Sequence, residues 1–94
     1  MSRPHPLAME LKQLFSDFQR ELPASRKSML PRIKSLALSI KSQSGNSYVS
    51  QKCTSLFGCC ENLARLRQPK GFDENREIVL ALGDISKIQE NFSE

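Results

Sequence analysis

The stretch FDENREIVLALGDISKIQENF, residues 72–92, carries the clearest helical signature in the chain. Phe72 is placed to act as a hydrophobic staple and Asp73 as the N-cap, and the acidic residues that follow favour the positive end of a helix dipole. Apolar residues then recur with the 3.6-residue period of one helix face. The predicted buried face consists of Ile78, Leu82, Ile85, Ile88, Gln89 and Phe92. We therefore expect an amphipathic helix from Asp73 to the end of the sequence.

Three upstream segments show the same period, and prolines and glycines separate them. They span residues 7–22, 25–43 and 47–67, and each has apolar residues three or four positions apart. In the first segment the predicted buried face extends to Leu22, and Pro23 is expected to end the helix.

Pro31 leaves two interpretations of the second segment open. Proline is tolerated in a first turn, so the regular helix can begin near Leu30 with Ser28 as its cap. Alternatively the helix begins near Ser25, and Pro31 kinks it.

Four amphipathic helices with short connections favour an antiparallel bundle. We expect an all-α fold, an antiparallel four-helix bundle, formed by residues 1–94 as a single helical-bundle domain. Gly58 and Gly83 fall inside predicted helices, where each costs roughly 1 kcal/mol relative to alanine. Close approach of neighbouring helices would be one physical reason for these glycines.

Charge is unevenly distributed along the chain. Residues 26–70 hold nine of the 14 basic residues but only one of the ten acidic residues. Lys27, Lys34 and Lys41 recur every seven positions and so lie along one side of the second helix. This stripe is either a solvated face beside acidic neighbours or a surface for nucleic-acid phosphates or acidic lipid. The candidate residues for binding an anionic surface are Arg26, Lys27, Lys34, Lys41 and Lys52.

Three apolar residues fall outside the predicted buried faces. They are Met9, Leu38 and Leu80, one on each of three helices. A single exposed apolar residue needs no explanation, but three together can form a second apolar surface. We expect such a surface to bind another protein or a second copy of this chain.

The sequence lacks the residues for a recognisable catalytic or metal site. His5 is the only histidine and lies between two prolines, so no nucleophile has a well-placed base. Cys53 and Cys60 are expected to be buried structural thiols, while Cys59 lies at the edge of that face and is the candidate reactive thiol. We predict no enzyme activity, no metal or cofactor and no small-molecule substrate.

These observations predict a non-catalytic protein–protein interaction domain: an adaptor, an assembly subunit or a small regulator. The alternative is a binder of an anionic surface, nucleic acid or acidic membrane, through the basic second and third helices. The N-terminus lacks the apolar region of a signal peptide, and no stretch is long enough to span a membrane. An intracellular location, cytoplasmic or nuclear, is therefore expected.

Overall fold

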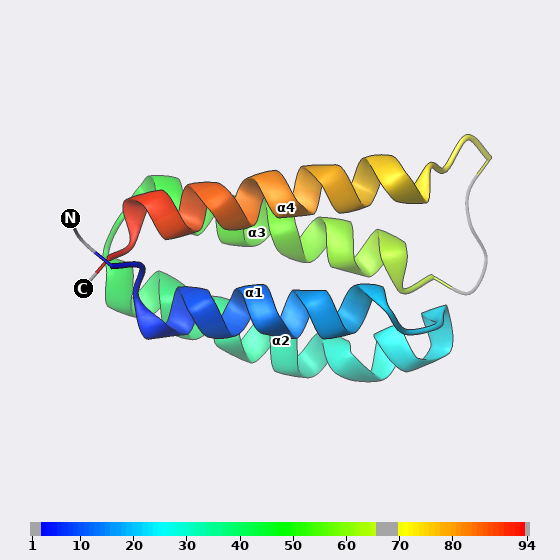
Figure 1. Ribbon diagram of the computed structural model, residues 1–94, viewed down its shortest axis with the longest axis horizontal. Helices are drawn as coiled ribbons and strands as arrows, with labels where there is room; N and C mark the ends of the chain where they lie inside the picture. The colour runs from blue at the N-terminus through cyan, green and yellow to red at the C-terminus, as the bar shows by residue number, and fades with distance from the viewer. Residues whose placement is uncertain (1–2, 66–69, 94) are drawn as a thin grey trace.

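The computed structural model describes residues 3–65 and 70–93. Its helices are α1 (Pro6–Gln19), α2 (Pro23–Ser44), α3 (Ser47–Leu63) and α4 (Glu74–Asn91). Successive helices run antiparallel, and packing joins α1 to α2, α2 to α3, α3 to α4 and α4 back to α1 (Figure 1). The predicted all-α fold, an antiparallel four-helix bundle, is confirmed. In this arrangement α2 and α4 lie diagonally opposite each other.

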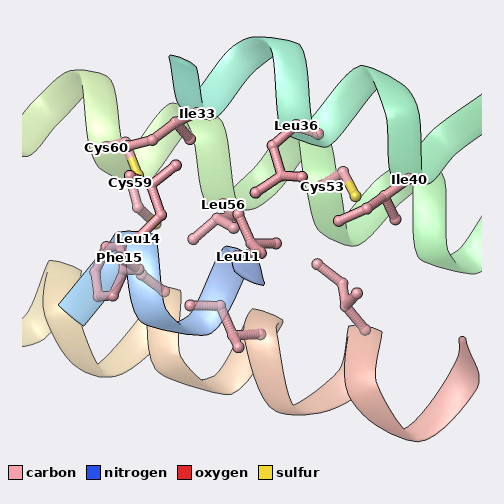
Figure 2. Close-up of a cluster of buried hydrophobic side chains, with 14 of the residues drawn as sticks. Leu11, Leu14, Phe15, Ile33, Leu36, Ile40, Cys53, Leu56, Cys59 and Cys60 are labelled. Carbon is pink, nitrogen blue, oxygen red and sulfur yellow. The ribbon is translucent and has the colours of Figure 1, made fainter. Parts of the chain in front are cut away.

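One hydrophobic core runs along the bundle axis and receives side chains from all four helices. Figure 2 shows side chains of α1, α2 and α3 meeting there, with cysteine sulfur atoms among the aliphatic groups. The largest fully buried side chains include Leu11, Phe15, Phe18, Ile33, Ile40, Leu56, Leu63 and Ile88. Burying each such side chain contributes about 1.5–3 kcal/mol, so the four apolar stripes supply the main force that holds the helices together.

The junction between α1 and α2 differs from the sequence-based prediction. α1 ends at Gln19, and Leu22, which we expected on its buried face, is 77% exposed. Pro23 does not end α1; it is the first residue of α2. Proline suits that position because the first backbone N–H groups of a helix have no partner within the helix.

α2 continues through Pro31, which lies in the helix interior. The early start is therefore confirmed and the start near Leu30 is wrong, while the kink at Pro31 stays a prediction. Ser28 does not cap the helix, because its hydroxyl donates to the Ser25 carbonyl oxygen at 2.7 Å. Pro31 has no N–H to donate to the carbonyl of the residue four positions earlier, so the helix loses one backbone hydrogen bond on its exposed side.

A tight turn reverses the chain between α2 and α3. Gly45 has a φ of 59°, a left-handed conformation that glycine adopts without a steric penalty. Asn46 then caps α3, since its Oδ1 accepts from the N–H groups of Tyr48 at 2.8 Å and Val49 at 3.3 Å. This turn sets α3 directly alongside α2.

The buried face of α4 is rotated relative to the predicted one. Leu82 is 42% exposed, although we expected it in the core. The buried residues of α4 are Ala81, Asp84, Ile85 and Ile88. These positions also follow the helical period, and the packing of α4 against α3 decides between the two registers.

The two ends of the described chain are joined at one end of the bundle (Figure 1). Pro4 and Ser93 form an antiparallel bridge, and the His5 N–H donates to the Phe92 carbonyl oxygen at 3.0 Å. The His5 ring stacks on the Phe92 ring with centroids 4.1 Å apart. His5 Nδ1 also accepts from the Leu7 N–H at 3.1 Å, which caps α1.

Candidate functional site

A groove between α2 and α3 combines an apolar floor with charged rims, and we call it the α2/α3 groove. It encloses about 280 Å³. Its lining residues are Lys34, Ala37, Leu38, Lys41, Cys53, Thr54, Phe57, Gly58 and Glu61. The volume lies at the lower end of the range for small-molecule pockets, roughly 300 Å³.

The α2 side of the groove carries part of the predicted lysine stripe together with one of the predicted off-face residues. Lys34 and Lys41 are two helical turns apart, about 10.5 Å along the axis, and both line the groove. Leu38 lies between them in sequence and is 53% exposed. The structure thus brings together two features that the sequence suggested separately, a basic stripe and an exposed apolar side chain.

The lysines of the groove differ in their engagement. The Lys41 Nζ donates to the Thr54 hydroxyl at 2.7 Å, a contact that joins α2 to α3. Lys34 is exposed and has no ion-pair or hydrogen-bond partner among residues 3–65 and 70–93. Lys27 lies seven residues before Lys34 on the same stripe and is also exposed. These ammonium groups are available to a bound anion.

The α3 side of the groove provides the apolar floor and one carboxylate. Phe57 is half-buried and packs against the core, and Glu61 is exposed on the rim. A Cβ added at Gly58 would meet no atom within 4 Å. The same holds for Gly83 on α4, so the expected close approach of neighbouring helices at these glycines is wrong. At Gly58 the missing side chain leaves open space within the groove.

Arg26 does not belong to the basic surface where we placed it; it is 4% exposed. Its guanidinium donates to three backbone carbonyl oxygens: from Nε to Phe18 at 3.3 Å, from Nη2 to Gln19 at 2.8 Å and from Nη1 to Leu63 at 3.0 Å. Nη1 also pairs with Glu74 Oε1 at 2.7 Å. Arg26 therefore satisfies the ends of α1 and α3 and the start of α4, which is a structural role.

Lys52 is only partly available, because it lies at the packed interface between α3 and α4. Its Nζ is 3.9 Å from Asp84 Oδ1 and 5.3 Å from the centre of the Tyr48 ring. Asp84 is buried, and its Oδ2 has no hydrogen-bond partner in the described structure. Of the five residues predicted to bind an anionic surface, Lys27 and Lys34 are exposed and Lys41 is half-buried beside them.

Met9, Leu38 and Leu80 are all exposed, but they do not form one surface. Leu38 is on α2 and Leu80 is on the diagonally opposite α4, where Val79 and Leu82 are exposed as well. Met9 lies at the contact between α1 and α4, and its sulfur is 3.6 Å from Gln89 Nε2. The expected single apolar surface is thus divided between α2 and α4, and Leu38 lines the α2/α3 groove.

All three cysteines are buried and free. Burial raises the pKa of Cys53 to about 11 and that of Cys60 to about 12. Burial also raises the pKa of Cys59 to about 12, and the neighbouring Glu77 carboxylate adds to the increase. Cys59 is only 7% exposed, so it lies inside the core and not at its edge as expected. A thiolate is the reactive form, and this environment disfavours it.

Two features are absent from residues 3–65 and 70–93. Within that part of the chain, no group of three histidine, cysteine or acidic residues is arranged to hold a metal ion. None of the helices in the same part is long and apolar enough to cross a membrane.

No protein-family model matches the sequence, and no curated protein or solved structure is significantly similar to the chain.

Proposed function

We propose that this chain is a non-catalytic protein-interaction domain that docks a segment of another protein in the α2/α3 groove. In this role it is an adaptor, an assembly subunit or a small regulator. We place it in the cell interior, where its three free thiols remain reduced. One observation carries the proposal: Leu38 is more than half exposed in a groove whose floor is apolar and whose rim holds lysines.

Protein recognition commonly relies on such a combination. An apolar anchor contributes affinity by leaving water, and charged groups at the rim fix orientation and exclude wrong partners. Leu38 and Phe57 offer the apolar contact, and Lys34 offers the unpaired charge. Because α2 and α3 are rigid elements fixed by the core, the site is formed before a partner arrives.

The rival function, binding to a flat anionic surface, has less support. A phosphate-binding surface gains affinity from the number of cations that contact phosphates at once. Arg26 and Lys52 are already paired with the carboxylates of Glu74 and Asp84, so two of the five candidate cations are not available to phosphates. Lys34 and Lys41 line a groove, and a groove fits a protein segment better than a duplex or a bilayer.

Gly58 provides the decisive test, because it lines the groove and a Cβ added there meets no neighbouring atom within 4 Å. A peptide library is panned on the wild-type chain, with counter-selection on Gly58→Leu. The matched control is Gly83→Leu, which makes the same change on α4, also in open space. Both replacements raise helix propensity by roughly 1 kcal/mol, so both proteins should stay folded, and circular dichroism checks this.

We expect peptides that bind wild type and Gly83→Leu equally and lose binding to Gly58→Leu. The proposal is refuted if no peptide distinguishes the two variants. It is also refuted if only acidic vesicles or duplex DNA bind, with a steep salt dependence and equal affinity for both variants. Self-association of the wild-type chain that Gly58→Leu abolishes would mean that a second copy occupies the groove and would refute docking of another protein.

A further inference from the structure

We propose that the occupant of the α2/α3 groove is an amphipathic α-helix that carries two acidic residues seven positions apart. This inference rests on the proposed docking function and specifies the chemistry of its partner. The observations behind it are the spacing of Lys34 and Lys41, the absence of acidic residues from α2, and the position of Glu61 on the opposite rim.

Charge complementarity identifies the partner as acidic. The sequence of α2 contains five basic residues and no acidic one. Arg26 is neutralised by Glu74, but Lys34 on the rim and Lys27 farther along the same stripe are exposed without an ion-pair partner among the described residues. A basic partner would meet repulsion along this whole rim, whereas an acidic one gains attraction at each lysine.

The spacing of the lysines favours a helix over an extended segment. Lys34 and Lys41 are about 10.5 Å apart along α2. In a helical partner lying along the groove, residues seven positions apart span the same distance and lie on the same face. In an extended strand that distance corresponds to about three residues, and side chains three positions apart point to opposite faces. A helix thus matches the lysine spacing with residues on one face, whereas a regular strand does not.

Glu61 makes the two rims of the groove differ in charge. The α2 rim carries Lys34 and Lys41, while the α3 rim carries Glu61. A bound helix must therefore present its acidic flank to α2 and keep carboxylates away from α3. Its apolar stripe lies between these flanks and faces Leu38, Phe57 and the open space at Gly58. A lysine or arginine on the second flank would complete the complementarity.

The test uses the full chain and a designed peptide of about 16 residues, stapled because short isolated helices are marginal in water. The peptide carries a leucine stripe, two glutamates seven positions apart on one flank, and one lysine on the other. A second peptide exchanges the charges of the two flanks. Fluorescence anisotropy measures the affinity of both peptides for wild type and for Lys34→Glu/Lys41→Glu. The control protein, Lys12→Glu/Lys87→Glu, makes the same net-charge change at exposed positions of α1 and α4.

We expect the double change in the groove to weaken binding of the acidic-flank peptide by about tenfold at low salt, and to strengthen binding of the exchanged peptide. The control protein should shift both affinities by less than about twofold. The inference is overturned if the groove and control variants behave alike. It is also overturned if the groove-dependent peptides from the library are extended or lack acidic residues, a result that leaves the docking function standing. If no peptide of any kind depends on Gly58, the docking function itself fails.

Discussion

Replacing Arg26 with methionine should destabilise the bundle severely. Arg26 belongs to a helix rich in basic residues, but it is buried. Methionine keeps an unbranched apolar stem of similar length, so packing is largely preserved while the guanidinium is removed. Three carbonyl oxygens then lose the guanidinium as a donor: Gln19 at the end of α1, Leu63 at the end of α3, and Phe18, which keeps a backbone hydrogen bond from the Glu21 N–H at 3.1 Å. Glu74 loses its partner as well, but it is half exposed and can be solvated.

The expected loss follows from the burial of these groups. A buried hydrogen bond from a charged donor contributes roughly 1.5–3 kcal/mol to stability. The methionine variant offsets part of this loss, because folding no longer removes a cation from water. We take about 1 kcal/mol for each carbonyl as the lower limit, which gives a loss of about 3–5 kcal/mol in the free energy of unfolding. A chain of this length has only about 5–14 kcal/mol in total. The midpoint of thermal unfolding should fall by at least about 12 °C.

Urea denaturation followed by circular dichroism at the helical minimum measures this loss. The neighbouring Lys27→Met serves as the control, because Lys27 is exposed and its change should stay within about 0.5 kcal/mol. Arg26→Lys should lie between wild type and Arg26→Met, since an ammonium group cannot reach three separate carbonyls with a planar fork. A loss of less than about 1 kcal/mol for Arg26→Met would refute the assignment of Arg26 as the residue that joins three helix ends.

Three other measurements follow from features of the core and the turns. Burial raises the pKa of Cys53 to about 11 and of Cys59 and Cys60 to about 12, against 9.0 for an exposed thiol, so above pH 9 the unfolded chain releases protons that the folded chain retains. The free energy of unfolding should therefore fall as pH rises from 9 towards 11, by at most about 1.4 kcal/mol per pH unit for each thiol. If the Cys59→Ala/Cys60→Ala variant shows the same fall as wild type, the buried thiols are not its cause. Asp84→Leu should leave the free energy of unfolding unchanged or raise it, as measured by urea denaturation. Asp84 is a buried carboxylate with one unpaired oxygen, and its lysine partner is 3.9 Å away. A loss above about 2 kcal/mol would show that the pairing of Asp84 with Lys52 stabilises the fold. Gly45→Ala should lower the free energy of unfolding by about 1 kcal/mol, because it forces alanine into a left-handed conformation, and Gly45→Asn should lower it less. A Cβ at this position meets no neighbouring atom within 4 Å, so steric contact is not the cause. Equal losses for the two variants would point to a cause other than backbone conformation.

The periodicity of apolar residues was sufficient to predict four helices and their antiparallel packing, because each stripe must be buried against another. Boundaries and registers depended on information that a stripe does not contain. Leu22 fits the period of α1, but α1 ends at Gln19 because Pro23 starts a new helix nearby. On α4, both Ala81 and Leu82 fit a buried face, and only packing against α3 decides that the smaller residue is buried.

The candidate site was only partly predictable for a similar reason. The heptad spacing of Lys27, Lys34 and Lys41 and the position of Leu38 were visible in the sequence. Their proximity to Phe57, Gly58 and Glu61 depends on how α2 and α3 are rotated against each other. Arg26 was misplaced because a basic residue in a basic segment is usually exposed, and nothing local indicates that the ends of two other helices meet there.

The contact between Pro4 and Ser93, supported by the His5–Phe92 stack, means that the polypeptide enters and leaves the bundle at one point. A domain with this geometry can be inserted into a surface loop of a carrier protein without stretching either flank, since adjacent ends impose little separation on the host. It can equally be closed into a ring by a short linker and reopened at Gly45, which would give a circular permutant in which α3 comes first. In that circular permutant the α2/α3 groove would be formed by the first and last helices of the sequence.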